Sequence, residues 1–223
     1  MKYATCLLVL AFLAGCASTP PVPAPDAGKG NALIEFRLLK RVAETNVADE
    51  YAVRREMHTR GATLSDMVIV LEGGSGPATT PTATEIALTE NGFSRRQLLL
   101  KKGGKLTLTN KRDRELVILG FSREGNEVAA ALKPGESRTL EVPHVGDYEV
   151  VTEADNGAYA VMHVVDTDQG WMGSSDELAL FRNLAPGRYK ASAWSSRALA
   201  WSSEFDVAAG ETASKRAEIK VAK

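Results

Sequence analysis

The chain has 223 residues, and its 27 lysines and arginines against 28 aspartates and glutamates give a formal net charge of −1. A balance so close to zero argues against a nucleic-acid partner, because binding to phosphate backbones requires an excess of basic side chains. The two cysteines, Cys6 and Cys16, both lie near the N-terminus. The remaining chain therefore forms neither disulfides nor thiolate metal sites.

The N-terminus combines a short apolar run with small residues and a cysteine. Residues 7–13 are apolar but too few to span a bilayer. The sequence Leu13-Ala14-Gly15-Cys16 that closes this run resembles the lipobox of bacterial lipoproteins. We therefore expect a signal peptide at residues 1–15 and a mature chain that begins with a lipidated Cys16.

The residues that follow the cysteine predict where the protein resides. Ala17, rather than an aspartate, comes next, and in the Gram-negative lipoproteins that this segment resembles that choice favours the outer membrane. Residues 16–31 are rich in proline and include Gly28-Lys29-Gly30 near their end, which predicts an extended tether. We expect a protein anchored by lipid to the periplasmic face of the outer membrane.

From residue 32 onward the sequence predicts an all-β body. Short alternating or apolar runs are separated by turn sequences such as Glu90-Asn91-Gly92 and Ala185-Pro186-Gly187, a pattern typical of β-sandwiches. Residues 42–57 alone have helical composition, and a long loop is the alternative for them. The expected strands are 32–39, 67–71, 105–110, 115–121, 146–152, 159–165, 187–195, 202–207 and 217–221.

Residues 77–166 contain an ordered series of motifs. Gly103-Gly104-Lys105 leads to a strand ending at Asn110, Lys133-Pro134-Gly135-Glu136 follows, and Gly146-Asp147-Tyr148-Glu149-Val150 comes last. This series resembles the cupredoxins, above all the plastocyanin-like periplasmic proteins often labelled methylamine utilization proteins. The resemblance implies a Greek-key β-sandwich. It also implies, for the family, a copper ion held by two histidines, a cysteine and a methionine.

The family's ligand positions carry other residues in this chain. Leu116 stands at the first histidine, Thr152 at the cysteine, Asp155 at the second histidine and Ala158 at the methionine. A blue-copper site requires two imidazoles and a thiolate in a trigonal arrangement. The resemblance, with these replacements, predicts a cupredoxin-like sandwich without copper or any other cofactor.

A hard cation is the alternative occupant of the same loops. Glu115, Glu153 and Asp155 carry carboxylates, which suit calcium or magnesium better than copper. Their spacing matches no calcium-binding loop, and charged loop residues are usually solvated. We therefore predict no metal site there and leave this alternative open.

No residue pattern indicates catalysis. Gly73-Gly74-Ser75-Gly76 neither opens a helix nor carries the lysine of a phosphate loop, and it predicts a hinge. None of the three histidines is spaced as one of a pair of metal ligands, so we expect ordinary surface or half-buried imidazoles. These are His58, His144 and His163. We assign no catalytic residue and predict that the protein is not an enzyme.

A second resemblance covers the ends of the body. The segment from Phe181 to Ala191, with its Pro-Gly-x-Tyr turn, resembles the closing half of carboxypeptidase-regulatory-like or transthyretin-like domains. Residues 32–76 would then supply the first strands of that β-sandwich and residues 167–223 the C-terminal portion. The cupredoxin-like segment is inserted between them in one layout, with hinges at 73–81 and 166–173, whereas two tandem sandwiches form the other.

The basic and aromatic residues outside the motifs each allow two interpretations of their role. Arg95 and Arg96 begin a basic stretch that continues to Arg114, which protects β edges from aggregation or, alternatively, steers a charged partner. Trp194 lies in an alternating run and is expected to pack into a core rather than to form a recognition surface.

Three classes of function follow from these observations. The first is a non-catalytic, lipid-anchored binding or assembly module of the periplasm. The second is a copper electron carrier or copper-handling protein, which the family suggests and the replaced ligands oppose. The third is an accessory subunit that holds a periplasmic enzyme at the membrane.

Replacement of the lipobox cysteine tests the anchor. Cys16→Ser removes the only thiolate that accepts diacylglycerol in this motif, so the protein should move from the membrane to the soluble periplasmic fraction and lose label from radioactive palmitate. Fractionation after a high-salt wash measures this shift. A variant that stays in the membrane would show that the anchor lies elsewhere.

Overall fold

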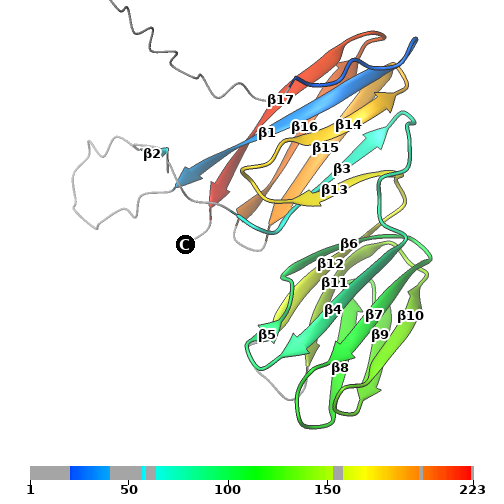
Figure 1. Cartoon of the computed structure of the whole chain (residues 1–223), viewed down its shortest axis with the longest axis vertical. Helices are drawn as coiled ribbons and strands as arrows, with labels where there is room; N and C mark the ends of the chain where they lie inside the picture. Colours follow the sequence, from blue (N-terminus) through cyan, green and yellow to red (C-terminus); the bar gives the residue numbers. More distant parts are fainter. Residues whose placement is uncertain (1–20, 41–56, 59–63, 153–157, 196–197, 222–223) are drawn as a thin grey trace, which may run out of the picture.

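The protein folds into two β units that are linked by two chain segments (Figure 1). The computed structural model describes residues 21–40, 57–58, 64–152, 158–195 and 198–221, and every regular element in them is a strand. The expected all-β fold is confirmed. We call β1–β3 with β13–β17 the host unit, and β4–β12 the two-sheet unit. Residues 42–56, for which helix and loop were both considered, lie outside the described residues.

The host unit is one sheet in the order β13-β3-β15-β16-β17-β1-β14, with β2 paired to β1. β16 and β17 share a single register pair, and the two outermost strands, β13 and β14, contact each other, so the sheet folds over on itself. The strands are β1 (Gly30–Lys40), β2 (Met57–His58), β3 (Met67–Gly73), β13 (Gln169–Gly173), β14 (Ala179–Leu184), β15 (Gly187–Ser195), β16 (Ala198–Val207) and β17 (Thr212–Val221).

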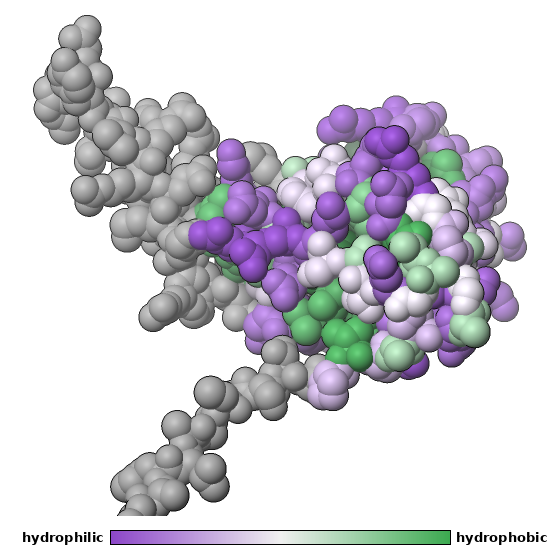
Figure 2. Space-filling model, turned by 90° about the horizontal axis from the view of Figure 1, so that it is seen from above, coloured by the Kyte–Doolittle hydropathy of each residue, from purple (hydrophilic) through white to green (hydrophobic). Residues whose placement is uncertain are grey.

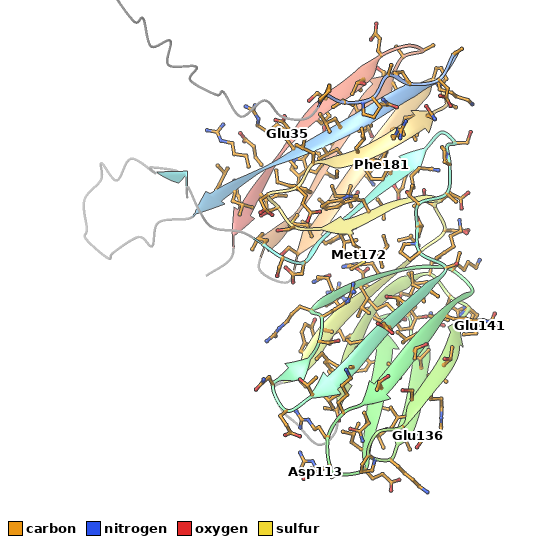
Figure 3. All side chains as sticks on the ribbon, in the orientation of Figure 1. Glu35, Asp113, Glu136, Glu141, Met172 and Phe181 are labelled. Carbon is orange, nitrogen blue, oxygen red and sulfur yellow. The ribbon has the colours of Figure 1, made fainter. Side chains whose placement is uncertain are left out.

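Alternating side chains give the host unit its core. Along β15, Tyr189, Ala191 and Ala193 point inward and are buried, while the residues between them point outward. Burial of these apolar side chains, with others such as Phe181 (Figure 3), supplies most of the stability of this unit. Seen from above in Figure 2, the surface is a mixture of hydrophilic and intermediate residues with smaller hydrophobic patches between them.

The two-sheet unit consists of a four-stranded sheet, β10-β7-β4-β5, and a five-stranded sheet, β6-β12-β11-β8-β9. Leucines from β6 and β7 meet Ile118, Tyr148 and Met162 in the space between the sheets. The strands are β4 (Ala83–Thr89), β5 (Gly92–Phe93), β6 (Gln97–Lys101), β7 (Gly104–Asn110), β8 (Leu116–Ser122), β9 (Glu127–Leu132), β10 (Ser137–Val142), β11 (Gly146–Thr152) and β12 (Tyr159–Val165).

The two-sheet unit leaves the host sheet after β3 and returns at β13. These two strands pair antiparallel, with Leu71 opposite Gln169 and Met67 opposite Gly173, so both connections start from one end of the same strand pair. Insertion at such a point is tolerated because the two chain ends lie close together. Within the described part of the chain, no helix is long and apolar enough to cross a membrane.

Several segments differ from the sequence-based expectation, since β4, β5, β6, β9, β10 and β14 were not among the expected strands. Residues 169–173, expected within a hinge, form β13 because they pair with β3. β6 was missed because Leu98-Leu99-Leu100 is a continuous apolar run, which a strand buried on both faces produces. β17 begins at Thr212 rather than at residue 217, since it pairs with β1 in parallel along its whole length.

Part of the predicted tether is held against the host unit. Asn31 is fully buried and donates from Nδ2 to the carbonyl of Pro23 at 2.8 Å. Asn183, whose φ of 55° is left-handed, accepts from the amide of Asp26 at 2.9 Å and donates to its carboxylate at 2.7 Å. The part of the expected tether from Pro23 onward is therefore hydrogen-bonded to the host unit.

Candidate functional site

The loop between β7 and β8 lies at the end of the two-sheet unit that points away from the host unit, where Figure 3 labels Asp113 and Glu136. Buried Asn110 fixes this loop. Its Nδ2 donates to the carbonyls of Arg114 at 2.8 Å and Leu132 at 3.1 Å, and its Oδ1 accepts from the amide of Arg112 at 2.9 Å. Because every polar atom of its amide group is used, Asn110 organises the loop and has no free group for a ligand.

The positions expected to correspond to copper ligands come together at this end. Leu116 begins β8, Thr152 ends β11 and Ala158 directly precedes β12, and all three side chains are buried. Leu116 and Ala158 belong to the apolar core. Asp155 lies outside the described residues. Leucine, threonine and alanine offer neither imidazole nor thiolate, so these three positions do not fit a blue-copper ion.

The carboxylates considered for a hard cation do not form a described site. Glu115 lines a shallow depression with Lys133, Glu136 and Arg138, whereas Glu153 and Asp155 lie outside the described residues. Bonding of Glu136 to the amide of Lys133 is the main reason that the pKa of Glu136 is lowered. In the described ranges, no group of three or more histidine, cysteine, aspartate or glutamate side chains is placed to hold a metal ion.

The junction between the units is an apolar contact. Val68 and Val70 of β3 point away from the host core and meet Leu99 of β6, and all three are buried. Half-buried side chains around them include Met172, which Figure 3 shows on the side of the host unit that faces the two-sheet unit. β3 and β6 are thus covered on both faces, and the two units share a small core of their own.

His163 of β12 lies at this junction. Its side chain is buried, and its ring stacks on Trp194 of the host unit with 4.9 Å between ring centroids. Nδ1 lies 2.7 Å from Asp147 Oδ1 and Nε2 lies 2.6 Å from Gln97 Oε1. The expectation of a surface or half-buried imidazole was therefore wrong for His163, because the host unit covers an outer face of the sheet that would otherwise be exposed.

His163 lies between two polar partners on neighbouring strands. The Asp147 carboxylate and the Gln97 amide each face one of its ring nitrogens, and which nitrogen donates depends on the tautomer of the ring and on the orientation of the amide. Donation by His163 lowers the pKa of the Asp147 carboxyl, and burial opposes that shift.

Trp194 differs from expectation in the same way. It belongs to β15, but it alternates with the inward Ala193 and therefore points outward. The two-sheet unit covers this outer face, so Trp194 is half-buried between the units rather than inside the host core.

The connecting segments are bonded to each other rather than free. The amides of Thr79 and Thr80 both donate to the carbonyl of Asp168, at 2.7 and 2.9 Å. Lys101 Nζ lies 2.9 Å from the Asp168 carboxylate. The Tyr189 hydroxyl lies 2.8 Å from the carbonyl oxygen of Ala185 and 3.2 Å from that of Ser75, and a Cβ at Gly74 would lie 2.2 Å from this hydroxyl oxygen. The segment at residues 73–81, which was predicted as a hinge, is held in place by these hydrogen bonds, and position 74 requires glycine.

A cleft of about 800 Å³ opens at the other end of the junction. Both units line it: the start of β3 and the end of β13 from the host unit, and the β5–β6 turn with the start of β12 from the two-sheet unit. The lining residues are Leu64, Ser65, Asp66, Met67, Phe93, Ser94, Arg95, Arg96, Gln97, Tyr159, Met172 and Gly173.

Charge and hydrogen-bonding capacity in the cleft favour an anion. Arg95 and Arg96 are exposed, and in the part of the chain that the structure describes neither guanidinium has a hydrogen bond or ion pair. Asp66 accepts from Ser195 Oγ at 3.1 Å, so its carboxylate is already partnered. Burial, with a smaller effect of Glu149, raises the pKa of Tyr159, and a phenol is a hydrogen-bond donor at neutral pH even without this shift.

Sequence patterns do not reveal this cleft. Arg95 and Arg96 appeared only as members of a basic stretch, for which edge protection was preferred. Their neighbours in the cleft, such as Asp66, Tyr159 and Met172, come from segments far apart in the sequence. The one sequence signal for the cleft is the Arg95-Arg96 pair at the start of a strand, because no acidic residue stands next to this pair in the sequence.

No family model matches the chain, and no curated protein matches it. Among solved structures, a copper(I) form of an amicyanin variant has 16% identical residues and a TM-score of 0.33, and the match covers 44% of this chain and 98% of that one. A purple cupredoxin from Nitrosopumilus maritimus has 15% identical residues and a TM-score of 0.32, and the match covers 37% of this chain and 99% of that one. The cupredoxin-like β fold expected from the motifs agrees with the two facing sheets of β4–β12.

The bond between Asp147 and His163 should make stability depend on pH. Asp147→Asn keeps the shape but loses the charge, and because Asp147 is largely exposed we expect a cost of only about 1 kcal/mol in the free energy of unfolding at pH 7. The pKa of the Asp147 carboxyl is lower in the folded state than its unfolded-state value of about 4, so its bond stabilises the fold above that pH. This contribution is lost as the pH falls through the lower pKa of the folded state. The difference between variant and parent should therefore shrink below pH of about 4.

Denaturant unfolding across this pH range measures the effect, with Asp113→Asn as the matched control in an exposed loop. Equal stability of Asp147→Asn and the parent at every pH would contradict the assigned bond.

Proposed function

We propose that the protein is a non-catalytic binding module, anchored by lipid at Cys16 to the periplasmic face of the outer membrane, and that its ligand site is the junction cleft. The ligand is an anion with an apolar body. The lipobox supports the anchor, and the cleft supports the binding role.

The observation that carries the proposal is the pair of arginines in a cleft built by both units. Guanidinium groups bind carboxylates and phosphates in bidentate fashion, and Arg95 and Arg96 have no competing partner among the described residues. Phe93 and Met172 add apolar surface for the remainder of the ligand. The hydroxyl of Tyr159 adds a neutral donor beside them.

The far end of the two-sheet unit supports a role without metal chemistry. A copper-handling function would require donor side chains at Leu116, Thr152 and Ala158, and these residues instead complete the packing. An enzyme-accessory subunit is a special case of the proposal, in which the anionic group belongs to a protein that the module holds at the membrane.

Phenyl phosphate is a suitable probe because it combines an anion with an aromatic ring. Its titration into the full chain, followed by amide chemical shifts, should show saturable binding that Arg95→Gln and Arg96→Gln each weaken about tenfold, equivalent to about 1.4 kcal/mol. Phenol has the aromatic ring without the anion, and inorganic phosphate has the anion without the ring. Each should bind more weakly than phenyl phosphate.

Arg182→Gln serves as the matched control, because Arg182 is exposed on β14 and does not line the cleft. Binding that survives loss of both Arg95 and Arg96, or that Arg182→Gln weakens equally, would overturn the assignment of the cleft.

A further inference from the structure

The five-stranded sheet of the two-sheet unit has an unusually apolar outer face. Strand alternation places Ile118, Val150 and Met162 toward the core, so their neighbours in sequence point outward. In an antiparallel sheet with one solvated face these outward positions are normally polar. Here most of them are apolar, and we call this set the outer apolar face: Val117, Leu119, Phe121, Ala129, Val151, Tyr159 and Val161.

Strand register brings these side chains into continuous rows. Val151 of β11 lies opposite Leu119 of β8 and Tyr159 of β12, and Leu119 lies opposite Ala129 of β9. A single row therefore crosses four strands with apolar side chains at every position. Phe121 and Tyr159 expose 44% and 39% of their surface. Apolar surface of this extent is characteristic of protein interaction sites.

The host unit covers only one end of the same face. Leu99, His163 and Val165 also point outward from the five-stranded sheet, and they meet Trp194 and the small core at the junction. No strand in the described ranges packs on the row through Leu119 and Val151. The outer apolar face thus continues an interface that the molecule already uses.

Acidic residues interrupt and border the outer apolar face. Glu149 lies directly between Phe121 and Val161 across the strands, and Glu127 pairs with Phe121 on the other side. With Asp147 and Arg123 beside these glutamates, the face carries a net negative charge, so a second copy would bring like charge to it, which is unfavourable. Contact with anionic lipid head groups would be unfavourable for the same reason.

We propose that the outer apolar face docks a protein partner that presents apolar side chains flanked by lysine or arginine. Opposite charge would neutralise Glu149 and Glu127 while Phe121, Leu119 and Tyr159 are buried. The surface shares Tyr159 with the lining of the junction cleft but does not include its arginines, and the proposal stands whether or not the cleft binds an anion.

Site-specific photocrosslinking in intact cells tests the proposal. A photoreactive phenylalanine analogue replaces Phe121, and in the control it replaces Thr139, an exposed residue of β10 in the other sheet. Position 121 should give a discrete protein adduct, and position 139 should not. Mass spectrometry of the adduct should find a partner segment with net positive charge.

Charge reversal makes the result specific. The combined change Glu127→Lys and Glu149→Lys should reduce the adduct at position 121 at least tenfold, whereas Glu141→Lys, an exposed glutamate of β10 (Figure 3), should leave it unchanged. Absence of an adduct, an adduct with a second copy, with lipid or with an acidic segment, or an adduct that survives reversal would overturn the proposal.

Discussion

The contact of Val68 and Val70 with Leu99 is the constraint on which the rest of the molecule depends. It turns two strands that would each have an exposed outer face, β3 and β6, into strands buried on both sides. Because β3 and β13 are neighbours in the host sheet, the inserted unit is attached by two connections as well as by this core. The stacked rings of His163 and Trp194 extend the contact, and the bonds among Thr79, Thr80 and Asp168 close its other end.

The proposed binding role follows from this attachment. The cleft is formed by the start of β3 on one side and by the β5–β6 turn on the other, so its shape exists only while the units hold their orientation. Arg95 and Arg96 then line a cleft of defined shape together with Phe93 and Met172. At the opposite end of the two-sheet unit, Leu116 and Ala158 belong to the apolar core. One end is thus closed by packing, and the other presents Arg95 and Arg96, which have no ion pair among the described residues.

Local patterns predicted about half of the strands, and they missed β4, β9, β10 and β14 although the two faces of β9 differ. They also failed where tertiary contacts bury both faces of a strand. Alternation located β15 from Gly187 to Ser195, yet it gave the wrong environment for Trp194, because the covering unit is remote in sequence. The run Leu98-Leu99-Leu100 shows no alternation of apolar and polar residues, because each face of β6 belongs to a different core, and the strand was therefore missed. His163 has no ligand-like spacing, and its partners Asp147 and Gln97 come from other strands. By contrast, the absence of donor atoms from the side chains of Leu116 and Ala158 follows from residue type alone and needs no tertiary contact.

The relative orientation of the two units tests the account most directly. Residual dipolar couplings of backbone amides, measured for the full chain in a weakly aligning medium, report the alignment of each unit separately. If the junction core fixes the units as described, couplings from β1, β3 and β13–β17 and those from β4–β12 should fit one common alignment tensor with the orientation of Figure 1. Two tensors of clearly different magnitude would show that the units move independently, and a cleft built from both of them would then have no defined shape.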